Sequence, residues 1–438
     1  MADKAPKPHE ILRSKDYGSL LVISAIFGIP VAIFSYFFLY IIDEIQKYVY
    51  TTLPGHFGSS TLQTWWPVVP LLISGIIVGW ATTRLPGKGG EVPINGLHTG
   101  GKPLKSKFLW SIGIAAVASI GLGAVVGPEA PLIALGGGLA YAMLKLVKSN
   151  APEQAGSLIS ASGSFASVST LLGSPLTGAF LLMEAAGLGG LMMEVALLPG
   201  LLAAGVGYLI FIGLDSLTGL GTFSLTIPNL PYYHSPTIGQ IIWAIIIGIL
   251  APILVFIIRK VAVTVNAQIK RPGIITTAIL GLIIALLAIS FSLITNQSHA
   301  YILFSGQNQL SVLLTNAGSL SIGALILIII FKGIAYSLSL IGFRGGPTFP
   351  AMFLGAVIGV LLSHIFGLTL VAGVAIGIGA MTASMLRLPL TAVLLTTIFL
   401  GSDGVKLMPI TILAAVIAYV GTQRIAGKMP LTSQDSPS

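Results

Sequence analysis

Long apolar runs separated by short polar segments dominate this chain. They lie near 18–42, 66–82, 108–143, 157–186, 191–213, 238–258, 274–295, 318–342, 350–380, 381–400 and 408–422. A helix needs about 20 apolar residues to cross a bilayer, so the pattern predicts an all-α polytopic membrane protein. Several runs contain some of the chain's 53 Gly and 25 Pro residues. Such breaks are tolerated in a membrane where they are buried or line a cavity, so we expect broken, tilted and half-crossing helices.

One ten-residue frame occurs twice in the chain. The pattern G-P-x-x-P-x-x-x-L-G spans 127–136 and again 346–355, and a Pro-Leu-Thr motif at 175–177 and 389–391 keeps nearly the same offset. Two shared frames in one register indicate an internal duplication. Each Gly-Pro pair, Gly127-Pro128 and Gly346-Pro347, predicts a helix start, because proline is tolerated in the first helical turn.

The charged residues between the runs suggest that the two halves are inverted relative to each other. The basic segments 84–107 and 145–154 have approximate counterparts at 296–317 and 364–379, which carry no Lys or Arg. The expected loop 43–65 carries one basic residue, whereas its counterpart 259–271 carries four. By the positive-inside rule the halves then lie in opposite orientations, as in inverted-repeat transporters with a site near the midplane. Accidental scatter of charge is the alternative.

The same pattern predicts the organisation of the chain. The run 18–42 is too long for a signal-peptide core of about 7–15 residues, so we expect a retained spanning helix. We expect a cytoplasmic tail over 1–17, a first repeat over 18–213, an external linker over 214–237, a second repeat over 238–424 and a cytoplasmic tail over 425–438. No soluble regulatory domain is expected.

Composition excludes several classes of function. The chain is 55% hydrophobic and 8% charged, against about 25% charged residues in soluble domains. The net charge of +9 lies largely in short loops, which fits anionic lipid better than nucleic acid. The chain has no cysteine, and its six histidines show no metal-ligand spacing. Since no Ser-His or Asp-Asp set appears in the runs, we expect no cofactor, no metal and no enzymatic activity.

Glu129 is the first candidate for chemistry. A carboxylate in an apolar run costs about 2.5–3.5 kcal/mol on insertion scales and is usually functional. It follows a helix-starting proline, where backbone N–H groups are free and the helix dipole is positive. Glu129 is therefore predicted to be a gate that an anion displaces and a proton neutralises. The alternative is a helix-capping acid that only stabilises the first turn.

Two further segments are candidate anion contacts. Thr348 occupies the position of Glu129 in the second frame, where it offers a hydroxyl and an N–H, although an ordinary first-turn threonine is the alternative. The glycine-rich loop 86–96 could form a nest of N–H groups for an anion. A flexible connector is the competing interpretation of this loop.

The remaining charged residues in apolar surroundings leave their roles open. Glu184 and Glu194 are interpreted as structural. Lys332 is the one cation inside a long run, and a functional role competes with snorkelling to the interface. Arg344 and Arg387 precede the second copies of the two motifs, where each could bind backbone carbonyls, face a vestibule or steer anions.

Three stretches, in this order, resemble motifs of the CLC chloride channel and antiporter family, and the resemblance covers nearly the whole chain. Gly-Gly-Glu-Val-Pro at 89–93 resembles the family's G-S-G-I-P, and Gly-Pro-Glu-Ala-Pro at 127–131 resembles its G-K/R-E-G-P. Gly-Gly-Pro-Thr-Phe-Pro at 345–350 resembles its G-x-F-x-P with the Phe displaced by one. The forms at 127–131 and 345–350 resemble those of a divergent bacterial branch of the family. The resemblance implies an inner-membrane homodimer with one pore per subunit, built from an inverted repeat.

The resemblance also implies roles and departures, residue by residue. Glu129 matches the external gating glutamate, and Thr348 and Phe349 match the helix start whose amides hold the anion. The pore serine falls at Gly90, the pore tyrosine at or near Thr432, and the internal proton-relay glutamate at or near Ala185. The candidate site then comprises a gate and proton acceptor, anion-contacting residues and residues of the helix starts: Glu129; Gly90, Glu91, Val92, Ala130, Thr348, Phe349 and Thr432; Pro93, Gly127, Pro128, Gly346 and Pro347.

These features predict transport of chloride or a similar monovalent anion, most simply as a channel. Missing hydroxyls, and the N–H groups that Pro128 and Pro347 lack, weaken anion binding, which suits passive conduction. A proton-coupled antiporter remains open, because water can carry protons in place of a second carboxylate. A fluoride exporter is a further alternative, although such relatives tend to carry an acid at the second helix start. An organic-anion transporter would need a cation deep in the bundle, for which only Lys332 is a candidate. The expected partners are chloride, the lipid bilayer and a second copy of the chain, with protons in the antiporter case.

Overall fold

A computed structural model describes residues 13–56, 60–97, 103–187, 191–219, 232–269, 273–364 and 367–426. This part of the chain forms helices, together with an isolated antiparallel bridge between Gly127 and Gly346. Nine helices of the described residues are long and apolar enough to cross a membrane, and five apolar helices are shorter, with 10–17 residues. The prediction of an all-α polytopic protein with half-length helices is confirmed.

The chain divides into two compact units. Unit 1 comprises Met1–Ile41, His98–Trp110 and Glu129–Ser224, and unit 2 comprises Ile42–Leu97, Ser111–Pro128 and Leu225–Ser438. The helices of unit 1 are α7 (Glu129–Val147), α8 (Glu153–Leu172), α9 (Pro175–Ala185), α10 (Leu191–Thr218) and most of α2 (Lys15–Lys47). Helix α6 (Ser106–Gly121) runs from one unit into the other.

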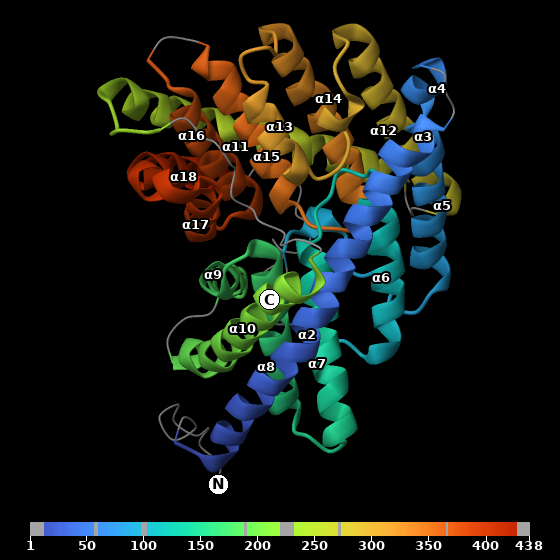
Figure 1. Ribbon diagram of the computed structural model, residues 1–438, viewed down its shortest axis with the longest axis vertical. Helices are drawn as coiled ribbons and strands as arrows, with labels where there is room; N and C mark the ends of the chain where they lie inside the picture. Colours follow the sequence, from blue (N-terminus) through green and yellow to red (C-terminus); the bar gives the residue numbers. More distant parts are fainter. Residues whose placement is uncertain are drawn as a thin grey trace. The chain divides into compact units, whose positions relative to one another are not determined.

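Unit 2 contains the remaining elements (Figure 1). They are η1 (Tyr48–Thr52), α3 (Leu53–Gly55), α4 (Ser60–Trp65), α5 (Val68–Arg84), η2 (Pro93–Asn95), α11 (Ile238–Ile269), α12 (Ile274–Thr295), η3 (His299–Tyr301), α13 (Gln307–Thr315), α14 (Ile322–Gly342), α15 (Thr348–Ser363), α16 (Leu370–Leu386), α17 (Pro389–Phe399), η4 (Gly401–Asp403) and α18 (Gly404–Ala426).

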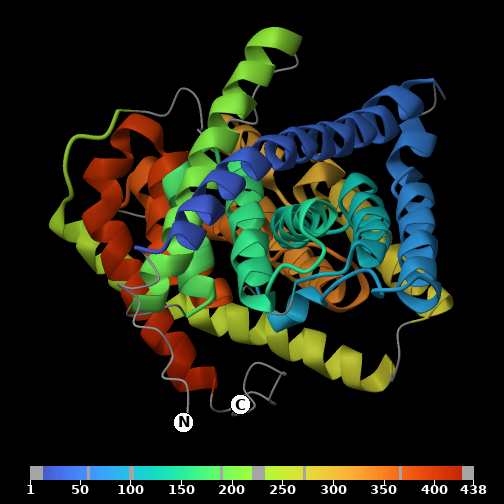
Figure 2. The same ribbon diagram turned by 90° about the horizontal axis from the view of Figure 1, so that it is seen from below.

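Glycines set the closest helix contacts in unit 2. On α15, Gly355 and Gly359 face Gly377 and Gly373 of α16, and a methyl group added at any of them would collide with the backbone opposite. Helices α5 and α12 lie side by side in Figures 1 and 2 and pack in the same way. Small residues that let helix backbones approach are the usual basis of packing inside a membrane.

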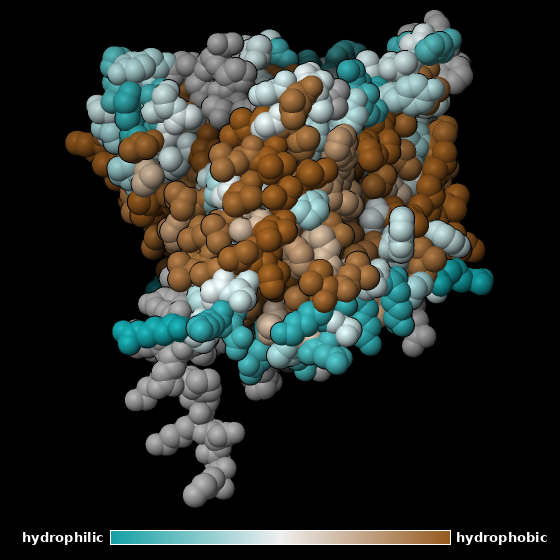
Figure 3. Space-filling model, turned by 60° about the horizontal axis from the view of Figure 1, so that its bottom comes forward, coloured by the Kyte–Doolittle hydropathy of each residue, from teal (hydrophilic) through white to brown (hydrophobic). Residues whose placement is uncertain are grey.

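The outward faces of the helices are apolar. Helix α11 alone exposes Ile242, Ile249, Ile253 and Ile257 by 45–53%. On the face drawn in Figure 3, hydrophobic residues form a broad area with hydrophilic residues at its margins. A contiguous apolar surface of this size fits contact with lipid rather than with water.

The order of the main helices repeats. The first-half helices α2, α5, α6, α7, α8, α9 and α10 correspond to α11, α12, α14, α15, α16, α17 and α18. Helices α2 and α11 have 33 and 32 residues and an internal proline each, and α9 and α17 both have 11 residues. The duplication read from two short frames therefore extends over most of the chain.

The predictions of loops at 43–65 and 259–271 are wrong. Residues 43–65 contain the end of α2, η1, α3 and α4, and α11 continues from the expected loop start at 259 to Ile269. Arg259 lies within α11, is only 5% exposed and donates from Nη2 to the carbonyl of Ile94 at 3.3 Å. Because a buried cation is not a loop charge, part of the orientation argument fails. The inversion of the two halves stays a prediction.

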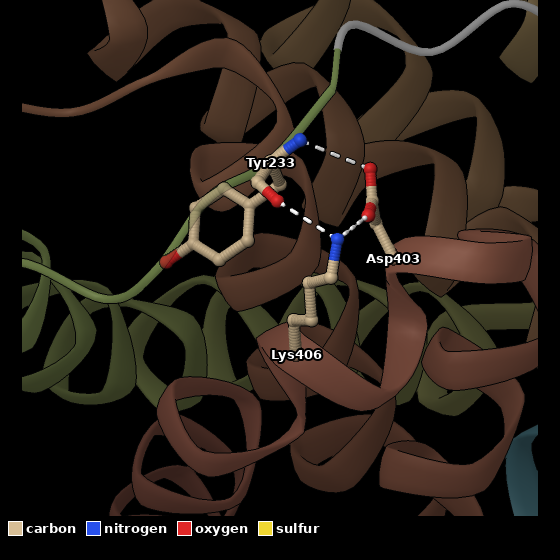
Figure 4. A network of polar contacts seen from close by, with 3 residues as sticks. All are labelled: Tyr233, Asp403 and Lys406. Atoms are coloured by element: carbon tan, nitrogen blue, oxygen red, sulfur yellow. Dashed lines mark hydrogen bonds and ion pairs between the residues drawn. The ribbon is translucent and has the colours of Figure 1, made fainter.

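The end of the predicted linker, at Tyr233, is held by hydrogen bonds within unit 2. The Tyr233 N–H donates to Asp403 Oδ2 at 3.0 Å, and Lys406 Nζ donates to the Tyr233 carbonyl at 3.1 Å and to Asp403 Oδ1 at 2.8 Å (Figure 4). Residues 232–237, before α11, are thereby attached to the start of α18. Residues 220–231 of the linker lie outside the described part of the chain.

Candidate functional site

The second helix start is buried, and the carbonyl directly before it is hydrogen-bonded. Helix α15 begins at Thr348, directly after Pro347, and Thr348 and Phe349 are 1% and 0% exposed. The Tyr336 hydroxyl of α14 donates to the Pro347 carbonyl at 2.6 Å. This bond fixes the peptide from which the helix departs.

The first helix start has the same form. Helix α7 begins at Glu129, directly after Pro128, and Glu129 is fully buried. The first four N–H groups of a helix lack partners within it. Because proline has no N–H, Pro128, Pro131, Pro347 and Pro350 remove four donors from the two helix starts. The helix starts predicted after Gly127-Pro128 and Gly346-Pro347 are found in the structure, whereas Pro93 begins only the three-residue 3-10 turn η2.

Equivalent glycines of the two frames are bonded to each other. The Gly127 N–H donates to the Gly346 carbonyl at 2.8 Å, and the Gly346 N–H donates to the Gly127 carbonyl at 2.6 Å. This reciprocal antiparallel pair lies in unit 2 and joins the first residues of the two frames. Each helix begins two residues after its bridged glycine.

A second reciprocal pair flanks the bridge. The Val125 N–H donates to Ser339 Oγ of α14 at 3.0 Å, and the Arg344 N–H donates to Ser119 Oγ of α6 at 2.9 Å. Ser119 lies two residues before the end of α6 and Ser339 three residues before the end of α14, and Val125 and Arg344 each lie two residues before a bridged glycine. Each half of the chain therefore gives the other a similar contact.

The glycine-rich loop is more closed than a nest of free donors. Gly87, Lys88, Gly89 and Gly90 all have positive φ, between 49° and 87°. Three of these four N–H groups donate within the protein: that of Lys88 to the Leu85 carbonyl, that of Gly90 to the Gly87 carbonyl, and that of Gly89, weakly at 3.4 Å, to Ser111 Oγ. An anion contact from this loop would therefore fall to the N–H groups of Glu91 and Val92, just before Pro93 of η2.

Lys332 is buried and bound by carbonyls, which excludes snorkelling. Its side chain is 0% exposed, and Nζ donates to the carbonyls of residues 301, 302, 303 and 304 at 2.9–3.3 Å. Burial lowers the pKa of the His299 imidazole in the adjacent turn η3, which favours its neutral form. Arg344 is 6% exposed, and its Nη1 donates to the carbonyl of Phe343 at 3.1 Å, as one of the alternatives predicted.

The other candidates are less informative. Glu184 is half-buried at the next-to-last position of α9, and Arg387 caps the end of α16 with φ of 59°. Thr432 and the side chain of Glu194 lie outside the described part of the chain. No group of three or more metal-ligating side chains occurs among the residues that the structure describes.

Sequence reasoning missed Tyr336, Ser339 and Ser119. A signal was present on α14, where Lys332, Tyr336 and Ser339 follow one another at helical spacing in an otherwise apolar run. Residues spaced in this way share one face of a helix. On this face Lys332 bonds to the carbonyls of residues 301–304, Tyr336 to the Pro347 carbonyl and Ser339 to the Val125 N–H.

Comparison with known proteins places these features in a family. The model of the family described as voltage gated chloride channel matches residues 71–423. The chain is 24% identical over 328 residues to "Putative ion-transport protein YfeO" of Escherichia coli O7:K1, covering 74% of this chain and 73% of that protein. The Shigella boydii serotype 4 protein of the same name matches equally well.

Solved structures share the fold. A slow cyanobacterial Cl⁻/H⁺ antiporter gives a TM-score of 0.76 at 21% identity, covering 93% of this chain and 95% of that one. A CLC-type fluoride/proton antiporter gives 0.65 at 20% identity, covering 93% and 96%. A eukaryotic CLC transporter gives 0.71 at 17% identity, covering 92% and 71%.

Proposed function

The chain belongs to the voltage gated chloride channel family, and on that basis we propose that it carries chloride or a similar monovalent anion across a bacterial inner membrane. The observation that carries this proposal is the reciprocal bridge between Gly127 and Gly346. It joins the residues that directly precede two helix starts, and the positive dipole end of a helix start favours a negative ion. No acid occurs in the second frame before α15, so only Glu129 opposes an anion there.

We propose Glu129 as the gate. It is the first residue of α7, so its carboxylate lies at the same helix end whose N–H groups would hold the anion. A carboxylate and chloride cannot share that end without repulsion. Protonation of Glu129 removes the competition and admits the anion. The paired contacts of Ser119 and Ser339 support an inverted orientation of the halves. In that orientation both helix ends would point at one central ion.

Passive conduction is the mode that we propose. Prolines at 128, 131, 347 and 350 leave each helix start with few donors, and Gly90 offers no hydroxyl. Weak binding allows an ion to leave as readily as it enters. Like members of the CLC family, the protein would work as a homodimer with one pore per subunit.

The decisive measurement is chloride efflux from liposomes that contain the purified protein, with and without the Glu129→Gln variant. We expect the variant to conduct faster than the wild type and to lose its dependence on pH. Glu153→Gln is the matched control, because Glu153 also begins a helix directly after a proline but is exposed. An unchanged pH dependence in Glu129→Gln would reduce Glu129 to a helix cap.

A proton-coupled antiporter is the second candidate. It is favoured by the antiporter folds among the structural relatives and by the half-buried Glu184 beside Ala185. In the same liposomes a chloride gradient would then drive protons uphill, and Glu184→Gln would abolish that movement. Chloride flux without proton movement supports the channel.

A further inference from the structure

The carbonyl cage around Lys332 has the geometry of a cation-binding site. Four consecutive carbonyls, from Tyr301 to Phe304, converge on one ammonium at 3.2, 3.3, 2.9 and 3.2 Å. The ring of Phe353 closes the cage, with its centroid 4.5 Å from Nζ. An ammonium has three N–H groups, so four oxygens share it much as they would share a bound alkali ion.

The loop that forms the cage is bent into an unfavourable shape. Phe304 has φ of 59°, which is an outlier for a bulky side chain, and Gly306 follows with φ of 91°. Consecutive carbonyls that point to one side repel one another unless a cation lies among them. The tethered ammonium therefore stabilises a turn that residues 301–304 would not adopt alone.

The same loop holds the segment that leads to the first helix start. The Phe304 N–H donates to the Gly123 carbonyl at 3.2 Å. The Phe304 ring meets the Tyr50 ring edge-on at 4.8 Å, and the Tyr50 hydroxyl donates to the Leu122 carbonyl at 2.8 Å. Residues 122 and 123 are thus held by hydrogen bonds from two sides.

Helix α14 holds this segment at a second point. Ser339 lies two turns after Lys332 and accepts the Val125 N–H at 3.0 Å. Val125 is followed two residues later by Gly127, which forms the bridge to Gly346. One face of α14 therefore fixes residues 122–127 at both ends, through the cage at one end and a serine at the other.

We propose that Lys332 is a positioning residue for the anion site: a tethered monovalent cation whose carbonyl cage fixes the segment 122–127 and, through the Gly127–Gly346 bridge, the peptides from which helices α7 and α15 depart. This inference rests on the proposed function for its link to the anion. The ligand class of the cage itself is a primary ammonium or an alkali ion.

The test begins with two substitutions at this position. Lys332→Met keeps an unbranched side chain, one atom shorter, and removes the charge, and Lys332→Ala opens the cage. For Lys332→Met we expect chloride binding, measured by calorimetry in detergent, to weaken at least about tenfold, which corresponds to about 1.4 kcal/mol. For Lys332→Ala we expect n-propylammonium, which replaces the lost methylenes and ammonium, to raise the melting temperature and restore chloride binding.

Controls separate the cage from general packing. 1-Propanol should not rescue Lys332→Ala, and n-propylammonium should leave the wild type unchanged. Ser339→Ala, which keeps the cage and removes the second attachment, should also weaken chloride binding. Ser337→Ala on the same helix should not, because its hydroxyl bonds only to the Gly333 carbonyl one turn earlier.

Three outcomes would overturn the proposal. They are wild-type chloride binding in Lys332→Met, rescue of Lys332→Ala by 1-propanol, and a lowered melting temperature in both variants with unchanged chloride affinity. A wild-type protein that neither binds nor conducts chloride would refute the proposed function instead. The stability of Lys332→Ala in n-propylammonium would still report on the cage in that case.

Discussion

Gly345→Ala is the sharpest perturbation of the paired helix starts. The φ angle of Gly345 lies outside the left-handed region, so alanine meets no backbone strain there. The obstacle is space. A Cβ at this position would lie 2.6 Å from Val126 Cβ and 2.8 Å from the Gly127 carbonyl oxygen. That oxygen accepts the Gly346 N–H, so the added methyl group pushes directly on the bridge.

The expected cost follows from these contacts. Overpacking by one methyl group costs about 1–3 kcal/mol. Loss of the two bridge hydrogen bonds adds about 1 kcal/mol each. Alanine recovers about 0.4–1 kcal/mol by restricting the unfolded chain. We therefore expect Gly345→Ala to destabilise the protein by about 2–5 kcal/mol if the bridge opens fully, and to reduce anion flux because the peptides before the helix starts separate.

Thermal unfolding in detergent and chloride flux in liposomes test this together. Gly323→Ala in the first turn of α14 is the control, because its nearest neighbour would be Ser321 Oγ at 3.9 Å. It should be neutral or stabilising by up to about 1 kcal/mol, as expected for an open helical site. A Gly345→Ala protein with wild-type stability and flux would refute the claim that the bridge fixes the peptides before the helix starts.

Two more predictions concern unit 2. Gly377→Ala places a methyl group against the backbone of Gly355 and should lower stability by about 1–3 kcal/mol, measured by thermal unfolding, because α15 and α16 must move apart. Asp403→Ala removes the acceptor of the Tyr233 N–H and the partner of Lys406, so hydrogen exchange at the Tyr233 amide should become faster.

Matched variants control these two predictions. Gly113→Ala in α6 meets nothing within 4 Å and should not destabilise the protein. Asp403→Asn keeps an oxygen for the Tyr233 amide and should lie between the wild type and Asp403→Ala. Unaltered unfolding in Gly377→Ala would contradict the close packing of α15 on α16. Equal exchange at the Tyr233 amide in the wild type, Asp403→Ala and Asp403→Asn would contradict the hydrogen bond from Tyr233 to Asp403.

The helix starts were predictable because their signals are local. A proline fixes φ and cannot continue an incoming helix, so Gly127-Pro128 and Gly346-Pro347 mark boundaries in any context. The repeated frame then predicted that the two boundaries belong together. The reciprocal hydrogen bonds across the bridge were not legible, since they depend on where each chain segment travels.

The carbonyl cage and the buried arginine could not be predicted for a related reason. Residues 301–304 read Tyr-Ile-Leu-Phe, an ordinary apolar stretch, and their carbonyls carry no signature of direction. Arg259 was counted as a loop charge because its acceptor, the Ile94 carbonyl, lies far away along the chain. A cation satisfied by backbone oxygens looks, in sequence, like a cation facing water.

Unit 2 draws its residues from both halves of the chain, and this has a consequence for biogenesis. Helix α5 packs through Gly75 and Gly79 on the start of α12, around residues 274–278, which the ribosome makes much later. Before α12 is synthesised, the glycine face of α5 lacks this partner. The first half made alone would therefore lack the residues of α12 against which α5 packs in unit 2.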